Sequence, residues 1–265
     1  ALKCFSKVLL KIKDDKTVFI ARGVVYQDMG NHQLAINDFN EAIKFDTELS
    51  EGYYRRGLSK FYMKRFKEAI NDFQLAKDKE EDMLDHDSTI EQNAGIPDGL
   101  GCCYHSLRDY DKAISYYDTA IEMMPENTEF LMHRAQCQYD QGHFDLSISD
   151  LRKGLKEEDG EAKNDPQVLY KLGLSFYANQ QYKKCVSTLK HALQNKPYIS
   201  YEADIYYHIG LAYCNVEKFE KAIYPFSRCV SIIPSEIKYI HERAKAYQMI
   251  EDHEKAVYDF DMVIK

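Results

Sequence analysis

Small and bulky apolar residues recur along the chain at a fixed spacing, and this spacing predicts pairs of packed helices. In each of seven units a small residue is followed after twelve positions by a second, after four more by a bulky residue, and after three more by a third small residue. The first small site is held by Gly23, Gly57, Gly101, Ala135, Gly173, Gly210 and Ala244. The bulky site is held by Phe39, Phe73, Tyr117, Leu151, Leu189, Phe226 and Phe260. Successive units are 34 residues apart, with 10, 4 and 3 extra residues at three junctions.

The spacing has a simple physical basis. Two helices approach closely only where their side chains are small, and a bulky residue then fills the space beside the contact. Helices of this length are marginal alone, so each pair needs its neighbours to complete a core. Gly30 and Gly142 mark turns inside a pair, and Pro125, Pro197 and Pro234 follow second helices. The pattern therefore indicates an all-α stack of helical hairpins.

These units resemble the tetratricopeptide repeat, a helix–turn–helix of 34 residues. The resemblance implies an all-α fold, a right-handed α-solenoid superhelix of such repeats. In this register we expect repeats 1 and 2 at 16–83, repeats 3 and 4 at 94–161, repeat 5 at 166–199, and repeats 6 and 7 at 203–265, the last truncated. Between them we expect an acidic insertion at 84–93, a short linker at 162–165 and a linker at 200–202. Residues 1–15 fit the second helix of a preceding repeat, and since neither end has a capping repeat, we expect a longer protein.

Charge and composition exclude several classes of protein. The formal net charge is −8, and the sequence has no basic stripe that would suit a nucleic acid. Eight acidic residues lie between Asp78 and Asp98 against one lysine, an arrangement typical of a solvated surface that can also steer a basic partner. No apolar run approaches the roughly 20 residues of a membrane span. The 45% apolar and 13% aromatic content is that of a folded chain.

Seven cysteines, an odd number without a CxxC motif, indicate free thiols in a reducing compartment, so we expect a cytoplasmic protein. Cys102, Cys103 and His105 lie close together, and His133 belongs to the next repeat. Zinc sites require four well-placed ligands, however, and Cys103 falls on a packing position. No nucleophile elbow, P-loop, HExxH or glycine-rich phosphate cradle occurs either. We therefore expect no metal, no cofactor, no small-molecule substrate and no catalytic site.

The resemblance implies that the first helices line a concave groove, through unit positions 2, 5, 9, 12 and 13. The candidate partner-binding residues there are Tyr54, Leu58, Phe61, Tyr139, Tyr170, Leu174, Tyr177, Tyr207 and Leu211, with the acids Glu51 and Asp204. Tyrosine supplies a large contact area at low entropy cost, so this face suits a polypeptide partner that is apolar with some basic residues. Two alternatives stay open: the side chains pack against neighbouring helices, or they cover a segment of the same chain.

These observations favour a non-enzymatic scaffold or adaptor that binds a partner polypeptide within a larger assembly. A general resemblance to long repeat arrays suggests a cytoskeletal or ciliary one. The alternative is a targeting or regulatory domain of a larger multidomain enzyme whose catalytic part lies outside this segment. The residue sets of chaperone-tail clamps and of sugar-transferring relatives are not matched in consecutive repeats.

Overall fold

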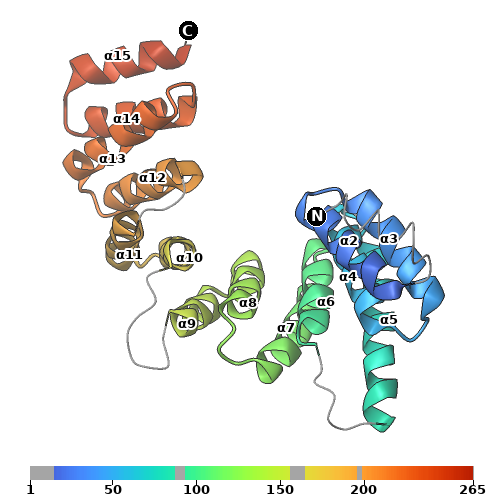
Figure 1. The fold of residues 1–265 in the computed structure, drawn as a ribbon. Coiled ribbons are helices and arrows are strands. Elements are labelled where there is room, and N and C mark those ends of the chain that lie inside the picture. The colour runs from blue at the N-terminus through green and yellow to red at the C-terminus, as the bar shows by residue number, and fades with distance from the viewer. Residues whose placement is uncertain (1–14, 87–92, 156–164, 196–198, 265) are drawn as a thin grey trace. The chain divides into compact units, whose positions relative to one another are not determined.

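The computed structural model describes residues 15–86, 93–155, 165–195 and 199–264, and within these ranges it contains fourteen α-helices and no strand (Figure 1). The helices of the N-terminal part are α2 (Lys16–Asp28), α3 (His32–Phe45), α4 (Ser50–Tyr62), α5 (Phe66–His86), α6 (Gly95–Ser106), α7 (Tyr110–Met123) and α8 (Thr128–Asp140). Those of the C-terminal part are α9 (Phe144–Gly154), α10 (Pro166–Ala178), α11 (Tyr182–Gln194), α12 (Ile199–Asn215), α13 (Phe219–Ile232), α14 (Ile237–Met249) and α15 (His253–Ile264).

Consecutive helices pack as hairpins, and each hairpin packs on the next. The hairpins α2–α3, α4–α5 and α6–α7 make one stack, and α10–α11, α12–α13 and α14–α15 make another. The chain divides into two compact units, Ala1–Cys137 and Gln138–Lys265, and the border falls within α8. The predicted all-α fold, a solenoid of helix–turn–helix repeats, is confirmed.

The bulky residue of each repeat lies where helices cross. Phe73 on α5 is 0% exposed, and its ring packs against glycines on both neighbouring first helices. A Cβ added at Gly57 of α4 would come within 2.9 Å of this ring, and one added at Gly99 of α6 within 2.7 Å. Phe226 packs in the same way against Gly210, where an added Cβ would lie 2.5 Å from the ring. The small residues are therefore small because an aromatic ring occupies the adjoining space.

The core continues from one hairpin to the next. Phe73 forms one buried cluster with Ala69 and Ala76 of its own helix and with Ile96 and Leu100 of α6. In the C-terminal unit Phe226 and Ala222 of α13 pack against Ala246 of α14. Each second helix thus buries its apolar face against the first helix of the following repeat, as stacked repeats require.

Every turn inside a hairpin contains one residue with a positive φ, always at the fifteenth position of its repeat. Two of these residues are glycines, Gly30 and Gly142. The other five are Lys64, Arg108, Gln180, Glu217 and Glu251, with φ between 57° and 63°. A left-handed conformation costs a residue with a side chain roughly 1 kcal/mol or more, so packing of the two helices fixes the turn even where glycine is absent.

Several predicted boundaries can be compared with the observed helices. Helices α2, α4, α8, α10 and α14 begin at Lys16, Ser50, Thr128, Pro166 and Ile237, the first residues of their predicted units. The predicted linker at 200–202 is wrong, because α12 begins at Ile199 and runs through these residues. They include no glycine or proline that would interrupt a helix, and Ala203, the next residue, is buried. The predicted insertion at 84–93 begins inside α5, which runs to His86, and its residues 87–92 lie outside the described part. Residues 1–14, predicted as part of the second helix of a preceding repeat, and residues 162–164 of the predicted linker at 162–165 also lie outside it.

Arginine–aspartate clamps join the helices of single repeats at three places in the described part of the chain. Each clamp pairs the arginine at position 7 of a repeat with the aspartate at position 23. They are Arg22–Asp38, Arg56–Asp72 and Arg243–Asp259. In each, Nε and Nη2 of arginine donate to the two carboxylate oxygens over 2.5–2.9 Å. The aspartates are 2–4% exposed, so these are desolvated ion pairs.

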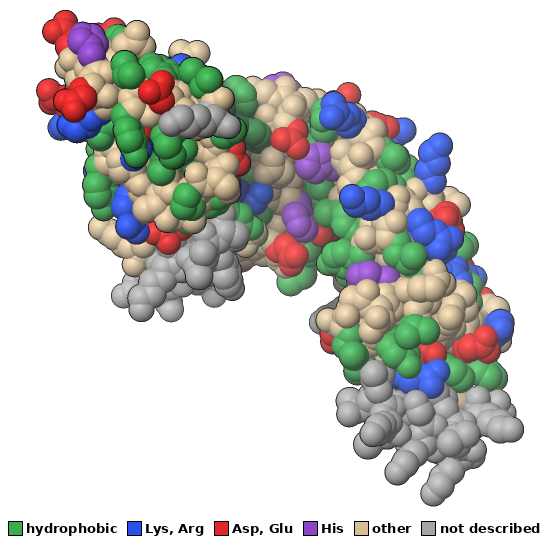
Figure 2. All heavy atoms as spheres, turned by 90° about the horizontal axis from the view of Figure 1, so that it is seen from above, with side chains coloured by type: hydrophobic (Ala, Val, Ile, Leu, Met, Phe, Trp, Pro, Cys, Tyr) green, Lys and Arg blue, Asp and Glu red, His purple; other side chains and the backbone are tan. Residues whose placement is uncertain are grey.

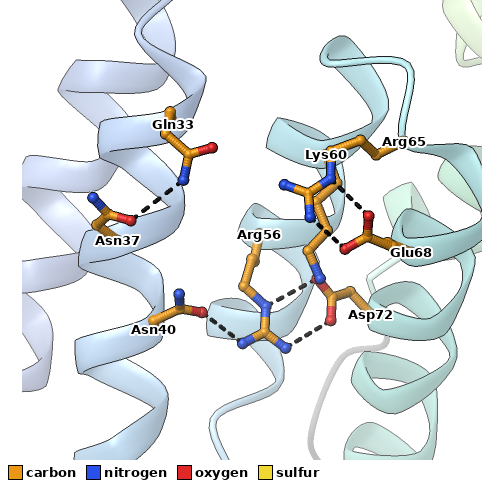
Figure 3. Close-up of polar contacts among 8 residues, drawn as sticks. All are labelled: Gln33, Asn37, Asn40, Arg56, Lys60, Arg65, Glu68 and Asp72. Carbon is orange, nitrogen blue, oxygen red and sulfur yellow. Dashed lines mark hydrogen bonds and ion pairs between the residues drawn. The ribbon is translucent and has the colours of Figure 1, made fainter.

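The clamp arginine also reaches back to the preceding repeat (Figure 3). Nη1 of Arg56 donates to Asn40 of α3 over 2.8 Å, and Lys60 supplies a second cation to Asp72 at 2.7 Å. At the same unit position Arg134 donates to Asp118 of α7 over 2.6 Å. One side chain therefore ties two helices of its own repeat to the second helix of the repeat before it.

Candidate functional site

The predicted groove residues of the N-terminal unit lie together on α4. Tyr54, Leu58 and Phe61 are partly exposed and pack against the buried cluster around Phe73. The Tyr54 ring lies 6.0 Å from the Phe73 ring, and the Phe61 ring lies 5.6 Å from that of Phe66. Each side chain thus has one edge in the core and one edge in solvent.

The C-terminal unit carries a longer row of partly exposed side chains on the two first helices α10 and α12. Tyr177 of α10 lies 5.6 Å from His208 of α12, and its hydroxyl accepts a hydrogen bond of 3.2 Å from Asn215. Tyr207 of α12 lies 5.4 Å from the ring of Tyr239 on α14. The predicted residues Tyr170, Leu174 and Leu211 are partly exposed beside them. We call this row, Tyr170, Leu174, Tyr177, Tyr207 and Leu211, the aromatic row.

Tyr139 lies on a different first helix from both sets. It lies near the end of α8, and its ring makes an edge-on contact of 5.4 Å with Phe144 at the start of α9. Like the others it is only partly exposed. One side of each ring therefore packs on a neighbouring helix, as the first alternative stated. The other side is accessible to solvent.

The phenols of this face are neutral at neutral pH, as ordinary tyrosines are, and burial shifts their pKa further upward. Burial raises the pKa of Tyr54, Tyr139, Tyr177 and Tyr207, and it raises the pKa of Tyr170 to about 12. At neutral pH each ring consequently offers an apolar surface and an O–H donor, which suits a peptide backbone.

The two predicted acids differ in environment. Glu51 is exposed, and its carboxylate lies 3.5 Å from the guanidinium of Arg55 one turn along the same helix. Asp204 is partly buried on α12 and accepts a hydrogen bond of 3.5 Å from the hydroxyl of Tyr239. Lys238 approaches the faces of Tyr207 and Tyr239 at 5.5 and 5.0 Å, so this part of the face carries both signs of charge.

A further group of polar residues meets on the first helices of repeats 3 and 4. Nδ1 of His133 on α8 lies 2.8 and 3.1 Å from the two carboxylate oxygens of Asp98 and 3.6 Å from Sγ of Cys102, both on α6. Asp98 is 9% exposed, and the hydroxyl of Tyr117 donates to Sγ of Cys102 over 3.5 Å. Burial by itself would lower the pKa of His133, but its hydrogen bonds to Asp98 and Cys102 outweigh burial and raise that pKa to about 10.

This group is not a nucleophilic relay. A histidine that activates a thiol uses one ring nitrogen for the thiol and the other for the orienting carboxylate. Here the same atom, Nδ1, faces both Cys102 and Asp98. The other residues considered in the sequence lie elsewhere, since Cys103 is buried against Phe73 and the His105 ring packs at 5.8 Å from Tyr110.

Sequence reasoning missed Asp98 because it belongs to an acidic stretch that is typical of a solvated surface. A signal was present, however: Asp98 and Cys102 are four residues apart, so they share one face of a helix. His133 is 35 residues from Asp98, one residue more than the repeat length, so it occupies an adjacent position on the next first helix.

Sequence comparison now identifies the repeats. The tetratricopeptide repeat family matches residues 17–48, 99–127 and 167–197, which cover three of the hairpins. The chain is a tetratricopeptide repeat protein. Its similarity to curated relatives extends beyond these three segments. The BBSome complex member BBS4 of Bos taurus is 22% identical over 89% of this chain and 49% of the relative.

Two further relatives extend the comparison. DnaJ homolog subfamily C member 3 of Rattus norvegicus is 21% identical over 94% of this chain and 59% of the relative. Intraflagellar transport protein 70A1 of Mus musculus is 21% identical over 47% of this chain and 24% of the relative. The chain thus spans about half the length of the first two relatives and a smaller share of the third.

Solved structures show the same fold. The C-terminal part of a TPR repeat-containing protein from Cytophaga hutchinsonii has a TM-score of 0.72 at 20% identity, covering 92% of this chain and 94% of that chain. A chain of the APC/C hetero-tetramer Cut9–Hcn1 has a TM-score of 0.69 at 15% identity, covering 92% and 45%. At these identities the likeness concerns the fold alone.

On the face drawn in Figure 2, hydrophobic, acidic and basic side chains are interspersed, and the described residues in view form no continuous basic stripe. Among the described helices none is both long and apolar enough to cross a membrane.

Proposed function

We propose that this tetratricopeptide repeat protein is a non-enzymatic scaffold that binds a segment of a partner protein on its first helices. The aromatic row is the observation that carries the proposal. Within the same repeats the bulky core residues Leu189 and Phe226 are 0% exposed, whereas the rings of the aromatic row remain partly open to solvent. Aromatic rings left in this state across adjacent helices suit a protein partner.

The partner that this face fits is an extended or helical polypeptide with apolar residues and some basic ones. The rings and leucines offer apolar contact, while Asp204 on α12 and Glu51 on α4 attract lysine or arginine. The partly exposed side chains Tyr54, Leu58 and Phe61 would bind in the same way in the N-terminal unit, with Tyr139 between the two sets in sequence.

The names of two relatives support a role in a multiprotein assembly. They are described as a BBSome complex member and an intraflagellar transport protein. We propose that the scaffold works in a multiprotein assembly of the cytoplasm, associated with a cilium or the cytoskeleton.

Truncating two rings of the aromatic row should weaken partner binding. For Tyr170→Ala combined with Tyr177→Ala we expect a loss of about 2 kcal/mol or more, about thirtyfold in Kd, because interface tyrosines carry a large share of binding energy. The measurement is quantitative affinity capture from extracts of the source cells, followed by titration of the captured partner. Raised salt should also slow the association if basic residues of the partner meet the acids.

The matched control is Tyr224→Ala combined with Tyr258→Ala. These tyrosines are 64% and 65% exposed on the second helices α13 and α15, so they test tyrosine removal away from the first helices. Binding should survive this change. If both double variants retain the same partners with the same affinity, the aromatic row is not the binding surface.

A further inference from the structure

The group formed by Asp98, Cys102 and His133 brings three possible partner atoms to a single ring nitrogen. A ring nitrogen carries at most one hydrogen, yet Nδ1 of His133 faces two carboxylate oxygens and one sulfur, all within 3.6 Å. One hydrogen on Nδ1 would therefore have to be shared between Asp98 and Cys102. A cation at the centre of the three ligand atoms would be bonded to all of them at once.

The spacing of the ligand atoms fits such a cation. Within the described residues, these three side chains are one group whose ligand atoms all lie within 4.8 Å of one another. Zinc bonds of about 2.3 Å to sulfur and about 2.05 Å to nitrogen, set at a tetrahedral angle, place the two atoms about 3.6 Å apart. The observed distance between Sγ of Cys102 and Nδ1 of His133 is 3.6 Å. The corresponding nitrogen–oxygen distance is about 3.3 Å, so Asp98 would withdraw by a few tenths of an ångström from its present 2.8 Å.

We propose that Asp98, Cys102 and His133 bind a divalent metal ion, zinc by the chemistry of the three donors, and that this ion joins α6 to α8. A thiolate, an imidazole and a carboxylate together are typical of zinc and unsuited to magnesium or calcium, which prefer oxygen ligands alone. Three protein ligands leave a fourth position for water, and the side chain of His133 is 33% exposed, which gives solvent a path to it.

The surroundings support a bound metal. Tyr117 donates a hydrogen bond to Sγ of Cys102, and an outer hydrogen bond of this kind stabilises a metal-bound thiolate. Asp98 and Cys102 lie one turn apart on a single helix, so two of the ligands are already oriented by α6. The sequence alone led us to expect no metal, because zinc sites need four well-placed ligands and Cys103 falls on a packing position. The structure leaves Cys103 and His105 out of the group and brings Asp98 and Cys102 to His133, which the sequence had only assigned to the next repeat.

Cobalt(II) provides the test, because a Co–thiolate bond absorbs in the near ultraviolet and four-coordinate cobalt absorbs strongly in the visible. The purified chain is first treated with a chelator and then titrated with cobalt. We expect one equivalent to bind with both signals, and one equivalent of zinc to remove them. Zinc, but not magnesium, should also raise the Tm of the apo protein, because a ligand that binds only the folded state stabilises it.

The variants decide which residues bind. Cys102→Ala should abolish the thiolate band, and Asp98→Asn should weaken zinc binding by at least about tenfold, as loss of a metal contact generally does. The control is Cys214→Ala, which removes another partly exposed cysteine, on α12, and should leave the spectrum unchanged. If the wild-type protein shows no thiolate band, or if Cys102→Ala retains it, the proposal is wrong and the group is a histidine–aspartate ion pair.

Discussion

Replacing Phe73 with alanine is expected to lower the free energy of unfolding by about 3–5 kcal/mol, because it leaves a cavity among rigid helices. The ring is 0% exposed and lies between Gly57 on α4 and Gly99 on α6. Glycines have no side chain that can move into the vacated space, so the cavity cannot close without a shift of the helices. Denaturant titration followed by far-ultraviolet circular dichroism measures the loss.

The control for Phe73→Ala is Leu75→Ala on the same helix. Leu75 is 40% exposed, so its truncation should cost well under 1.5 kcal/mol. Tyr170 and Tyr177 of the aromatic row should fall between the two, because they are only partly packed. If Phe73→Ala and Leu75→Ala destabilise the protein equally, the crossing of α4, α5 and α6 at Phe73 is not a main source of stability.

Replacing Asp72 with alanine should destabilise the protein by a similar amount, about 3–5 kcal/mol, for an electrostatic reason. The carboxylate accepts two hydrogen bonds from Arg56 and lies 2.7 Å from Nζ of Lys60. The side chains of Arg56 and Lys60 are only 17% and 14% exposed. Without Asp72, two neighbouring cations would be left largely desolvated and would repel each other. Chemical denaturation at neutral pH measures the effect.

Figure 3 also shows the matched control, the pair Arg65–Glu68. Its geometry is the same, with Nε and Nη2 of Arg65 donating to the two oxygens of Glu68 over 2.7 and 2.6 Å. Its side chains, however, are 39% and 49% exposed, so Glu68→Ala should cost less than about 1 kcal/mol. The cost of Glu68→Ala should also shrink in high salt, while that of Asp72→Ala should not. Equal costs for the two variants would show that burial does not set the strength of the clamp.

The fold could be predicted from the sequence because the same packing constraint recurs in each repeat. A bulky side chain that packs against a small residue imposes the same spacing in every unit, as Phe73 with Gly57 and Phe226 with Gly210 show. Helix starts such as those of α4 at Ser50 and α10 at Pro166 follow from that register. The error at 200–202 arose where the register has extra residues, because a 34-residue pattern says nothing about whether an insertion continues a helix.

Polar contacts were harder to predict from the sequence, because the two partner residues lie on different helices. The Arg56–Asp72 clamp has a sequence signal, a separation of 16 residues that recurs in Arg22–Asp38 and Arg243–Asp259, but charged residues are ordinarily assigned to the surface. The approach of His133 to Asp98 required the structure, because it depends on how two consecutive first helices pack. The aromatic row was predicted as a set of positions, and its role in binding a partner stays a prediction.

The backward reach of the clamp arginine has a consequence for how cooperatively the array unfolds. In a repeat protein the stability is approximately a sum over repeats and over the interfaces between neighbours. Arg56 and Arg134 add a polar bond to the interface with the preceding repeat, whereas Leu100, Leu172 and Ile209 occupy the same unit position in repeats 3, 5 and 6. Those three interfaces lack this bond and depend on the remaining contacts. Hydrogen exchange under native conditions should therefore find the borders of independently opening segments before α6, α10 and α12. Thermal fluctuations would then open the chain at interfaces chosen by one residue per repeat, the residue at unit position 7.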